Sequence, residues 1–261
     1  MNTKQSLLFL TLFSLISCSK LPTYHCLNKS QIDFSEPTYS GYNARFGFRW
    51  MLFQEADTFS LWIDSDLPLS QKKILYSGFK LYFDAEGKKN KTHYVHFPFA
   101  TERTFTMKDF DSSFKNDHFS VSKNKGLDAD IQKINKEMEV VLGDKTENLN
   151  YLYDQADINI KLEHQDGRLM YKLQIPMSKF GLTGLSKFSL GIESGALDFD
   201  VPDDLKDPGG MPRNTAMPNV NGTRGNPVTG TGPTGQQRQL STFNQIEEPI
   251  RFWMEINLNQ L

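Results

Sequence analysis

Three consecutive stretches in which apolar and polar residues alternate, all between residues 57 and 99, constrain this chain more than any other feature. Alternation with a period of two places every second side chain on the same side, as in a β-strand with one buried face. The residues predicted to share these buried faces are Phe59, Leu61 and Ile63, then Phe79, Leu81 and Phe83, then Val95, Phe97 and Phe99. A polar, glycine-containing link over residues 85–91 indicates that the last two strands pair through a loop. A sheet core therefore begins here.

The same alternation recurs on both sides of this stretch. It covers residues 45–53 before it, and residues 156–162, 169–175, 188–192 and 250–258 after it. Asp166 and Gly167 predict a tight turn between two of the later strands, because both residues tolerate positive φ angles. So many half-buried strands in 261 residues predict an all-β fold, as one large domain or two small ones.

One longer segment, residues 128–142, has the period of a helix. Its apolar residues recur at spacings of three and four, at Ile131, Ile134, Met138, Val141 and Leu142. Asp128 or Asp130 can cap its start, and Gly143 suits the left-handed position past its end. We expect this amphipathic helix to lie across one end or one face of the sheets. A shorter helical turn is expected over residues 70–76, capped by Ser70 and closed by Gly78.

The chain begins like a secreted protein. Lys4 is followed by an apolar run over residues 7–16, which is too short for a permanent transmembrane helix and is typical of a signal peptide. The next residues complete a tetrapeptide, Leu15-Ile16-Ser17-Cys18, that resembles a bacterial lipobox. That resemblance implies removal of residues 1–17, acylation of Cys18 with palmitate-type chains, and a mature protein held in the cell envelope. The alternative is an ordinary signal peptide with an incidental cysteine.

Ser19, which follows the cysteine, favours the outer membrane as the location of such a lipoprotein. Residues 18–40 mix Ser, Pro, Thr and Asn with little periodicity, and we expect them to form a tether between the lipid and the folded domain. The alternative is that the tether ends in an edge segment. Residues 202–245 hold six of the twelve prolines and seven of the eighteen glycines. Such a segment buries too little apolar surface to offset its ordering entropy, which predicts a disordered insertion. The folded domain is thus expected to comprise residues 41–201 and 246–261.

Charge and cysteine content exclude some classes. The chain has 29 basic and 31 acidic residues, and loss of Lys4 with the signal peptide changes the net charge from −2 to −3. Without a basic excess, nucleic acid is not an expected partner. If Cys18 is acylated, Cys26 has no partner for an intrachain disulfide. Stability must then come from a packed core, which 20 Phe, 9 Tyr and 3 Trp can supply.

The order of the segments resembles that of a known family. Trp50-Met51-Leu52 ends one strand, Gly78 and Asp84 bracket another, and Ile175-Pro176 closes a late one. The pattern is similar to family 9 carbohydrate-binding-module-like, or DOMON-like, β-sandwiches, and to lipoproteins of Bacteroidota that carry a Gly/Pro-rich insertion before the final strand. The resemblance implies an antiparallel, jelly-roll-like β-sandwich over most of residues 45–258. Because that family includes sugar binders, haem binders and members without a known ligand, it implies a fold more firmly than a function.

Three large aromatic residues fall on the polar side of their strands: Trp62, Tyr82 and Trp253. Exposed rings can stack on sugars, and rings from paired strands lie close enough to form one platform. Asp64 and Arg251 would lie on its rim as hydrogen-bonding partners for hydroxyl groups. In the alternative, the helix or the loop over residues 100–125 covers this face, and the rings form a second layer of core.

Signals for metal, cofactor or catalysis are weak. His93 and His96 stand three apart on a predicted strand, so they point to opposite faces and cannot chelate one ion together. Met107, Met170 and His118 are available as haem ligands, but no spacing selects them. The sequence contains no G-x-S-x-G, H-E-x-x-H, P-loop or dinucleotide motif. Carboxylates are plentiful, so a glycosidase pair stays open as an alternative, although pairs also occur by chance.

These observations favour a non-catalytic cell-envelope lipoprotein that binds glycan, without a cofactor or metal. The alternative is a structural or assembly lipoprotein that contacts other envelope proteins and has no small-molecule ligand.

Overall fold

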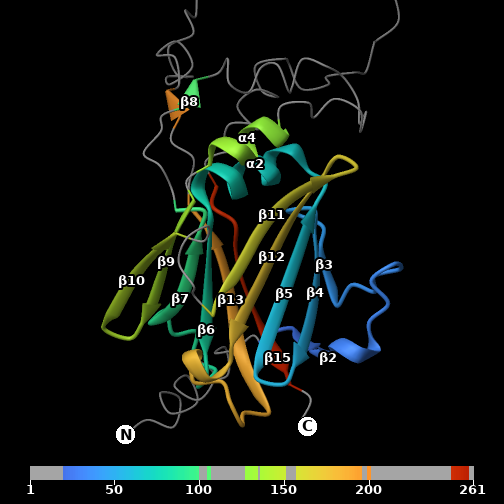
Figure 1. Ribbon diagram of the computed structural model, residues 1–261, viewed down its shortest axis with the longest axis vertical. Helices are drawn as coiled ribbons and strands as arrows, with labels where there is room; N and C mark the ends of the chain where they lie inside the picture. Colours follow the sequence, from blue (N-terminus) through green and yellow to red (C-terminus); the bar gives the residue numbers. More distant parts are fainter. Residues whose placement is uncertain are drawn as a thin grey trace, which may run out of the picture.

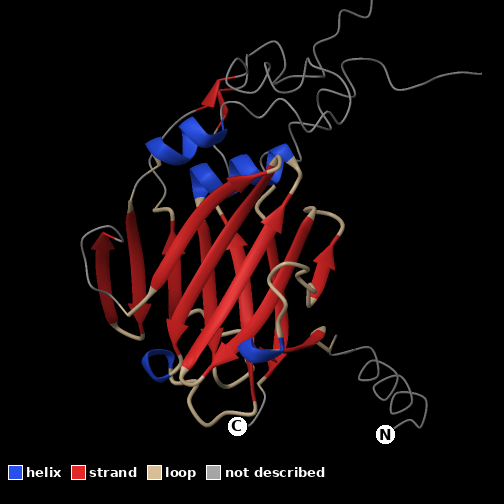
Figure 2. Cartoon of the chain, turned by 45° about the vertical axis from the view of Figure 1, so that its right-hand side comes forward, coloured by secondary structure: helices blue, strands red, loops and turns tan. Residues whose placement is uncertain are grey.

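Two β-sheets pack face to face and enclose the hydrophobic core in the computed structural model (Figures 1 and 2). The structure describes residues 20–99, 105–106, 127–134, 136–150, 157–195, 199–200 and 248–258. The predicted signal peptide, Cys18 and the predicted insertion over residues 202–245 lie outside the described residues. The all-β sandwich expected from the sequence is confirmed.

The larger sheet, here called sheet A, has seven strands. Their order across the sheet is β1 (Thr23–His25), β15 (Arg251–Asn257), β13 (Lys187–Ser194), β6 (Phe79–Asp84), β7 (His93–Phe97), β9 (Glu137–Leu142) and β10 (Lys145–Asn150).

The smaller sheet, sheet B, has six strands, and a separate two-stranded sheet completes the set. Sheet B runs β11 (Asn159–Gln165), β12 (Arg168–Pro176), β5 (Thr58–Ser65), β4 (Phe48–Glu55) and β2 (Leu27–Asn28), with β3 (Gly41–Asn43) also paired to β4. The small sheet joins β14 (Phe199–Asp200) to β8 (Phe105–Thr106). Within sheets A and B, pairing is antiparallel except where β1 joins β15 and β2 joins β4. The sheets are thus mixed rather than wholly antiparallel.

The faces predicted from alternation form the core. The predicted inward residues of β5, β6 and β12 are each at most 1% exposed: Phe59, Leu61, Ile63, Phe79, Leu81, Phe83, Leu169, Tyr171, Leu173 and Ile175. Phe188, Leu190 and Ile192 of β13 and Met254 and Ile256 of β15 are buried as well. The turn at Asp166 and Gly167 has positive φ at both residues, as predicted. Alternation therefore identified the buried faces because one side of each strand packs against the opposite sheet.

Within the described residues, the two α-helices lie at one end of the sandwich rather than across a sheet face (Figure 1). They are α2 (Pro68–Ser77) and α4 (Leu127–Lys133), and two 3₁₀ turns, η1 (Lys29–Gln31) and η3 (Ser178–Phe180), lie elsewhere. Helix α2 begins earlier than predicted, with Pro68 in its first turn, because proline's fixed φ suits that position. Ser70 does not cap it: its hydroxyl donates to the carbonyl of Phe46. Gly78 ends the helix with φ +67°, as expected.

The predicted helix over residues 128–142 is wrong in its second half. Helix α4 ends at Lys133, and Met138, Val141 and Leu142 belong to β9. The segment also alternates, so Met138 and Val140 point into the core as strand residues. As a strand, β9 satisfies its backbone groups by pairing with β7 and β10, and its adjacent β-branched valines favour that choice. Tertiary pairing therefore overrides the helical spacing.

The predicted tether is also shorter than residues 18–40. Residues 23–25 pair with β15 on sheet A, and residues 27–28 pair with β4 on sheet B. Between them Cys26 is fully buried, and this burial raises the pKa of its thiol to about 12. The folded domain therefore starts before residue 41, and its first residues link the edges of the two sheets. No helix within the described ranges is both long and apolar enough to cross a bilayer.

Candidate binding surface

The three aromatic residues predicted to form one platform lie on two different sheets. Trp62 belongs to β5 of sheet B, whereas Tyr82 and Trp253 belong to β6 and β15 of sheet A. All three point away from the core, and the outer faces of the two sheets point in opposite directions. The single platform is therefore wrong. Alternation assigns a residue to the polar side of its own strand, but it does not say which sheet that strand joins.

The outer face of sheet A nevertheless carries an aromatic row. Gly191 of β13 pairs with Trp253 on one side and with Tyr82 on the other. Tyr82 pairs in turn with Tyr94 of β7. Three rings thus occupy one line of register across four neighbouring strands, which we call the aromatic row. Tyr94 is an addition to the predicted set, although its place on the polar side of the third alternating stretch was visible in the sequence.

The rings of the aromatic row contact one another. The centroids of Tyr82 and Trp253 lie 5.8 Å apart with an interplanar angle of 17°, and Tyr82 meets Tyr94 edge to face at 5.5 Å. The Trp253 ring lies over Gly191, where a Cβ would come within 2.7 Å of the indole. Glycine at this position therefore leaves room for the indole on the sheet surface.

A row of charged and polar side chains runs beside the aromatic row, two residues further along each strand. Register pairs these residues across five strands in the order Arg251, Glu193, Lys80, His96 and Glu139. Because positions two apart on a strand share a face, these side chains and the aromatic row lie on the same outer surface.

Ion pairs and hydrogen bonds connect the two rows. Glu193 accepts from Lys91 Nζ at 2.5 Å and from Arg251 Nε at 2.8 Å. Burial alone would raise the pKa of Glu193, but its bonds to Lys91 and Arg251 outweigh burial and lower it. Burial, together with the charge and hydrogen bond of Glu193, raises the pKa of Tyr82. Near pH 7 this surface therefore combines a carboxylate, two cations and a neutral phenol.

Tyr94 and His96 are organised by the adjacent strand. The Tyr94 hydroxyl donates to Glu139 Oε1 at 2.8 Å, and burial with this bond raises the pKa of Tyr94 to about 12. His96 Nε2 lies 3.2 Å from the carbonyl of Ser77, which assigns the proton of the neutral ring to that nitrogen. Burial lowers the pKa of His96, and its buried Nδ1 lacks a hydrogen-bond partner.

Trp62, on the opposite outer face, is partly covered by the N-terminal segment. Phe34 lies 5.2 Å from its ring centroid, and Phe53 of β4 meets it edge to face at 5.5 Å. Lys172 Nζ lies over the same ring at 4.5 Å. Trp62 is thus part of a second layer of packing, as in the alternative considered from the sequence. The covering segment, however, is neither the helix nor the loop named there.

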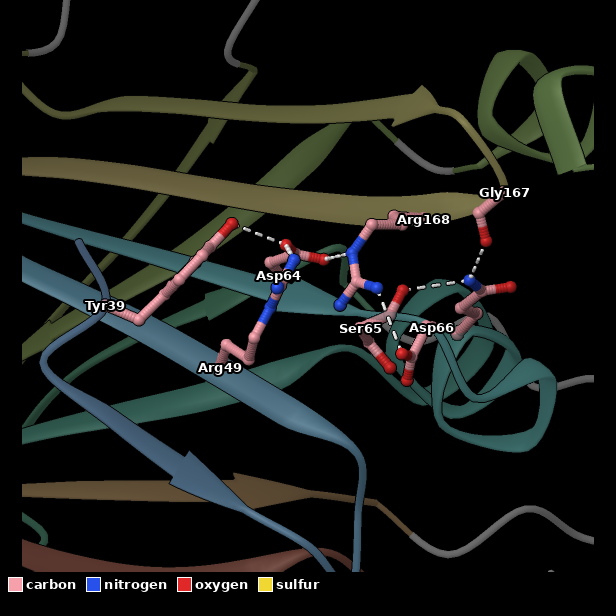
Figure 3. Close-up of polar contacts among 8 residues, drawn as sticks. Tyr39, Arg49, Asp64, Ser65, Asp66, Gly167 and Arg168 are labelled. Atoms are coloured by element: carbon pink, nitrogen blue, oxygen red, sulfur yellow. Dashed lines mark hydrogen bonds and ion pairs between the residues drawn. The ribbon is translucent and has the colours of Figure 1, made fainter. Parts of the chain in front are cut away.

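Asp64 lies in a cluster of charges on that same face of sheet B (Figure 3). Its carboxylate accepts from the Tyr39 hydroxyl at 2.7 Å and from the guanidinium groups of Arg49 and Arg168. Arg168 also donates to Asp66 at 3.0 Å. Asp64 is only 3% exposed, so its oxygens are committed to protein partners. It therefore belongs to the architecture of sheet B and not to the rim of the aromatic row.

The surface on sheet A has the chemistry to hold a polyhydroxylated ring. Half-exposed Trp253 and Tyr94 present aromatic surface, and Arg251, Lys80 and Glu193 supply donors and acceptors beside it. Tyr82 is only 6% exposed, so it supports the other two rings and offers little surface of its own. Stacking on the rings combined with hydrogen bonds to the charged row would orient such a ligand.

No group of three or more His, Cys, Asp or Glu residues in the described part of the chain is arranged to hold a metal ion. Of the haem ligands considered from the sequence, Met170 is on β12 directly opposite Asp64, a residue of the outer face of sheet B. Met107 and His118 lie outside the described residues. No protein-family model matches the chain, and comparisons with curated proteins and with solved structures find no match either.

Proposed function

We propose that this chain is a non-catalytic, lipid-anchored protein of the cell envelope that binds glycan on the outer face of sheet A. The observation that carries the proposal is the aromatic row, formed by Trp253, Tyr82 and Tyr94 in continuous register and flanked by the charged row. An aromatic surface beside paired charges suits a ligand that has both apolar faces and hydroxyl groups. The lipid anchor is the acylated Cys18 implied by the lipobox-like tetrapeptide.

The row crosses the strands, which favours an elongated ligand. Neighbouring strands lie about 4.8 Å apart, so the backbones from β15 to β7 span about 14 Å, and the rings above them lean toward one another. Ring centroids within the row are separated by 5.8 and 5.5 Å, a spacing comparable to one sugar unit of an extended chain. A linear oligosaccharide lying across the strands could therefore stack on Trp253 with one unit and on Tyr94 with another. If each ring contributes about 1 kcal/mol, binding should be micromolar to millimolar.

Two tryptophan variants test this proposal, because both residues are half-buried and they lie on opposite outer faces. Trp253→Ala should lose about 1 kcal/mol of binding, which is about fivefold in Kd. Trp62→Ala is the matched control and should bind as the parent does. Affinity electrophoresis against a panel of soluble polysaccharides measures retention, and thermal unfolding of each variant verifies the fold.

Equal retention of the two variants would place the binding surface elsewhere. If the parent protein is not retained by any polysaccharide in a broad panel, the glycan proposal is lost.

A structural or assembly role is the second candidate. The low exposure of Tyr82 and the mutual pairing of Glu193, Lys91 and Arg251 favour it, because these groups already satisfy one another. In that case the outer face of sheet A would contact another envelope protein. Failure of glycan binding, together with cross-linking of the protein to an envelope partner through this face, would support that role.

A further inference from the structure

The N-terminal residues 20–43 run along one side of the sandwich. In Figure 1 they are the blue segment that includes β2 and β3. Strand β1 is the edge of sheet A, and β3 lies at the edge of sheet B. Tyr24 contacts Trp50 with ring centroids 5.2 Å apart, and a Cβ at Gly41 would lie within 2.7 Å of both rings. The two edges therefore meet, and we call this side the N-terminal edge.

The predicted lipid would emerge at this edge. Cys18 precedes Lys20 by two residues, so their Cα atoms are at most about 7 Å apart. Lys20 lies beside β15, where Pro22 O accepts from the amide of Glu255 at 2.9 Å. The hydrogen bond from Lys187 lowers the pKa of Glu255, and the charge of Lys20 contributes to that shift. Because β1 starts at Thr23, no long tether separates the sandwich from acyl chains on Cys18.

The exposed aromatic side chains belong to the same N-terminal segment. Within the described part of the chain, the large hydrophobic residues that are exposed are Phe34, at 43%, and Tyr42, at 61%. Both belong to residues 20–43, a small part of the described chain: Tyr42 is on the edge strand β3, and Phe34 packs against Trp62 on the adjoining outer face of sheet B. Aromatic side chains are the ones that settle at the boundary between lipid headgroups and acyl chains, because they combine an apolar body with a polar or polarisable edge.

We propose that the N-terminal edge and the adjoining part of the outer face of sheet B dock on the phospholipid surface, with Phe34 and Tyr42 entering the membrane interface. This inference rests on the acylation of Cys18 in the proposed function. The acyl chains hold the edge at the membrane, and the two rings fix its orientation there. Residues 20–43 contain two basic residues, Lys20 and Lys29, and two acidic ones, Asp33 and Glu36. This balance predicts docking on uncharged phospholipid without a requirement for anionic lipid.

Docking in this way leaves the aromatic row free. Sheet A begins at β1 on the N-terminal edge and ends at β10 on the far side. Its strands would then run along the membrane, and the aromatic row would lead away from it, from Trp253 of β15 to Tyr94 of β7. A glycan could reach the row without competing with lipid.

An environment-sensitive fluorophore tests the orientation. Tyr42→Cys and Asn148→Cys introduce single labelling sites on exposed residues at opposite edges, because Asn148 lies on β10. Cys26 is fully buried and Cys18 is acylated, so neither competes for the label. The full lipidated chain, labelled with nitrobenzoxadiazole, is reconstituted in phosphatidylcholine liposomes with and without a nitroxide-bearing lipid. Unchanged thermal unfolding shows that each labelled protein is folded.

The expected result is a blue-shifted label at position 42 that loses most of its emission to the nitroxide lipid, with an aqueous and unquenched label at position 148. In two cases the proposed docking is wrong although the lipid anchor is supported. In both, the protein floats with the liposomes; either position 42 is unquenched, or positions 42 and 148 are quenched equally. If the lipidated chain does not float, the anchor itself fails, and the docking fails with it. Cys18→Ala serves as the unanchored reference and should not float.

Discussion

The two outer faces of the sandwich carry similar residues that have different roles. On sheet B, the segment that contains Phe34 and Tyr39 folds back over β4 and β5, where it contacts Trp62 and Asp64. On sheet A, Trp253 contacts Tyr82 and lies over Gly191, within its own sheet. An aromatic residue on the polar side of a strand therefore has no fixed role. Its role depends on whether another segment of the chain crosses that face.

Strand β4 shows how closely the N-terminal segment covers the outer face of sheet B. Its inward residues Trp50 and Leu52 are buried, as alternation requires, but its outward residues Met51 and Phe53 are buried as well. A strand buried on both faces belongs to a third layer of packing, which the N-terminal segment supplies locally. The outer face of sheet B near β4 is thus part of the core, whereas sheet A keeps charged side chains on the corresponding surface.

The two outer faces should differ most in the stability that the protein loses when a central carboxylate on each face is neutralised. Asp64→Asn keeps the shape of the side chain but leaves Arg49 and Arg168 without their shared carboxylate. Because Asp64 is buried and both guanidiniums are half-buried, we expect the free energy of unfolding to fall by about 2–3 kcal/mol. Urea unfolding followed by circular dichroism measures the change.

Glu193→Gln is the matched control on sheet A. Its partners Lys91 and Arg251 are more exposed, so water replaces the lost interactions and the expected cost is below about 1 kcal/mol. If both variants lose equal stability, the charges on sheet B are not more deeply integrated into the fold than those on sheet A.

A smaller effect is expected when the aromatic row itself is disturbed. Gly191→Val adds a branched side chain where even a Cβ would lie 2.7 Å from the Trp253 ring. The ring must move, which should cost about 1–2 kcal/mol of stability and weaken glycan retention as Trp253→Ala does. Combining Gly191→Val with Trp253→Ala makes a double-mutant cycle. In the Trp253→Ala background, Gly191→Val should change stability very little. If it still destabilises the protein there, the loss comes from the backbone of β13 and not from a clash with the indole.

Much of the sandwich could be predicted because one physical rule decides it. A strand with one buried face alternates, so Phe59 and Leu61 of β5 or Leu190 and Ile192 of β13 could be placed in the core from sequence. The rule failed where two patterns coincide. Residues 137–142 fit both a helical stripe and an alternating strand, and pairing with β7 and β10 decided in favour of the strand.

The candidate site was only partly predictable, because its residues are brought together by strand order. Tyr82 and Trp253 were identified as outward rings, but their contact depends on β13 lying between β6 and β15. Trp62 has the same local pattern and joins the other sheet. Asp64 and Arg251, predicted as rim residues of one platform, are separated for the same reason. Alternation contains no information on which strands become neighbours across long sequence separations.

The smallest of the three effects compares a buried titratable group on each sheet. Asp64 of sheet B is paired with arginines, whereas the Nδ1 atom of His96 on sheet A has no hydrogen-bond partner and lies 3.8 Å from Glu139 Oε1. Burial lowers the pKa of His96 below its unfolded value of 6.5. The unfolded chain therefore binds the proton more readily, so stability should fall as the pH drops below about 6.5, until the folded pKa is reached. Urea unfolding at pH 7.5 and 5.5 measures this loss, which His96→Gln should reduce. His25→Gln, at an exposed position, should keep the full pH dependence of the parent. A parent protein that gains stability over this range, or an identical response of the two variants, would show that His96 is not the group responsible.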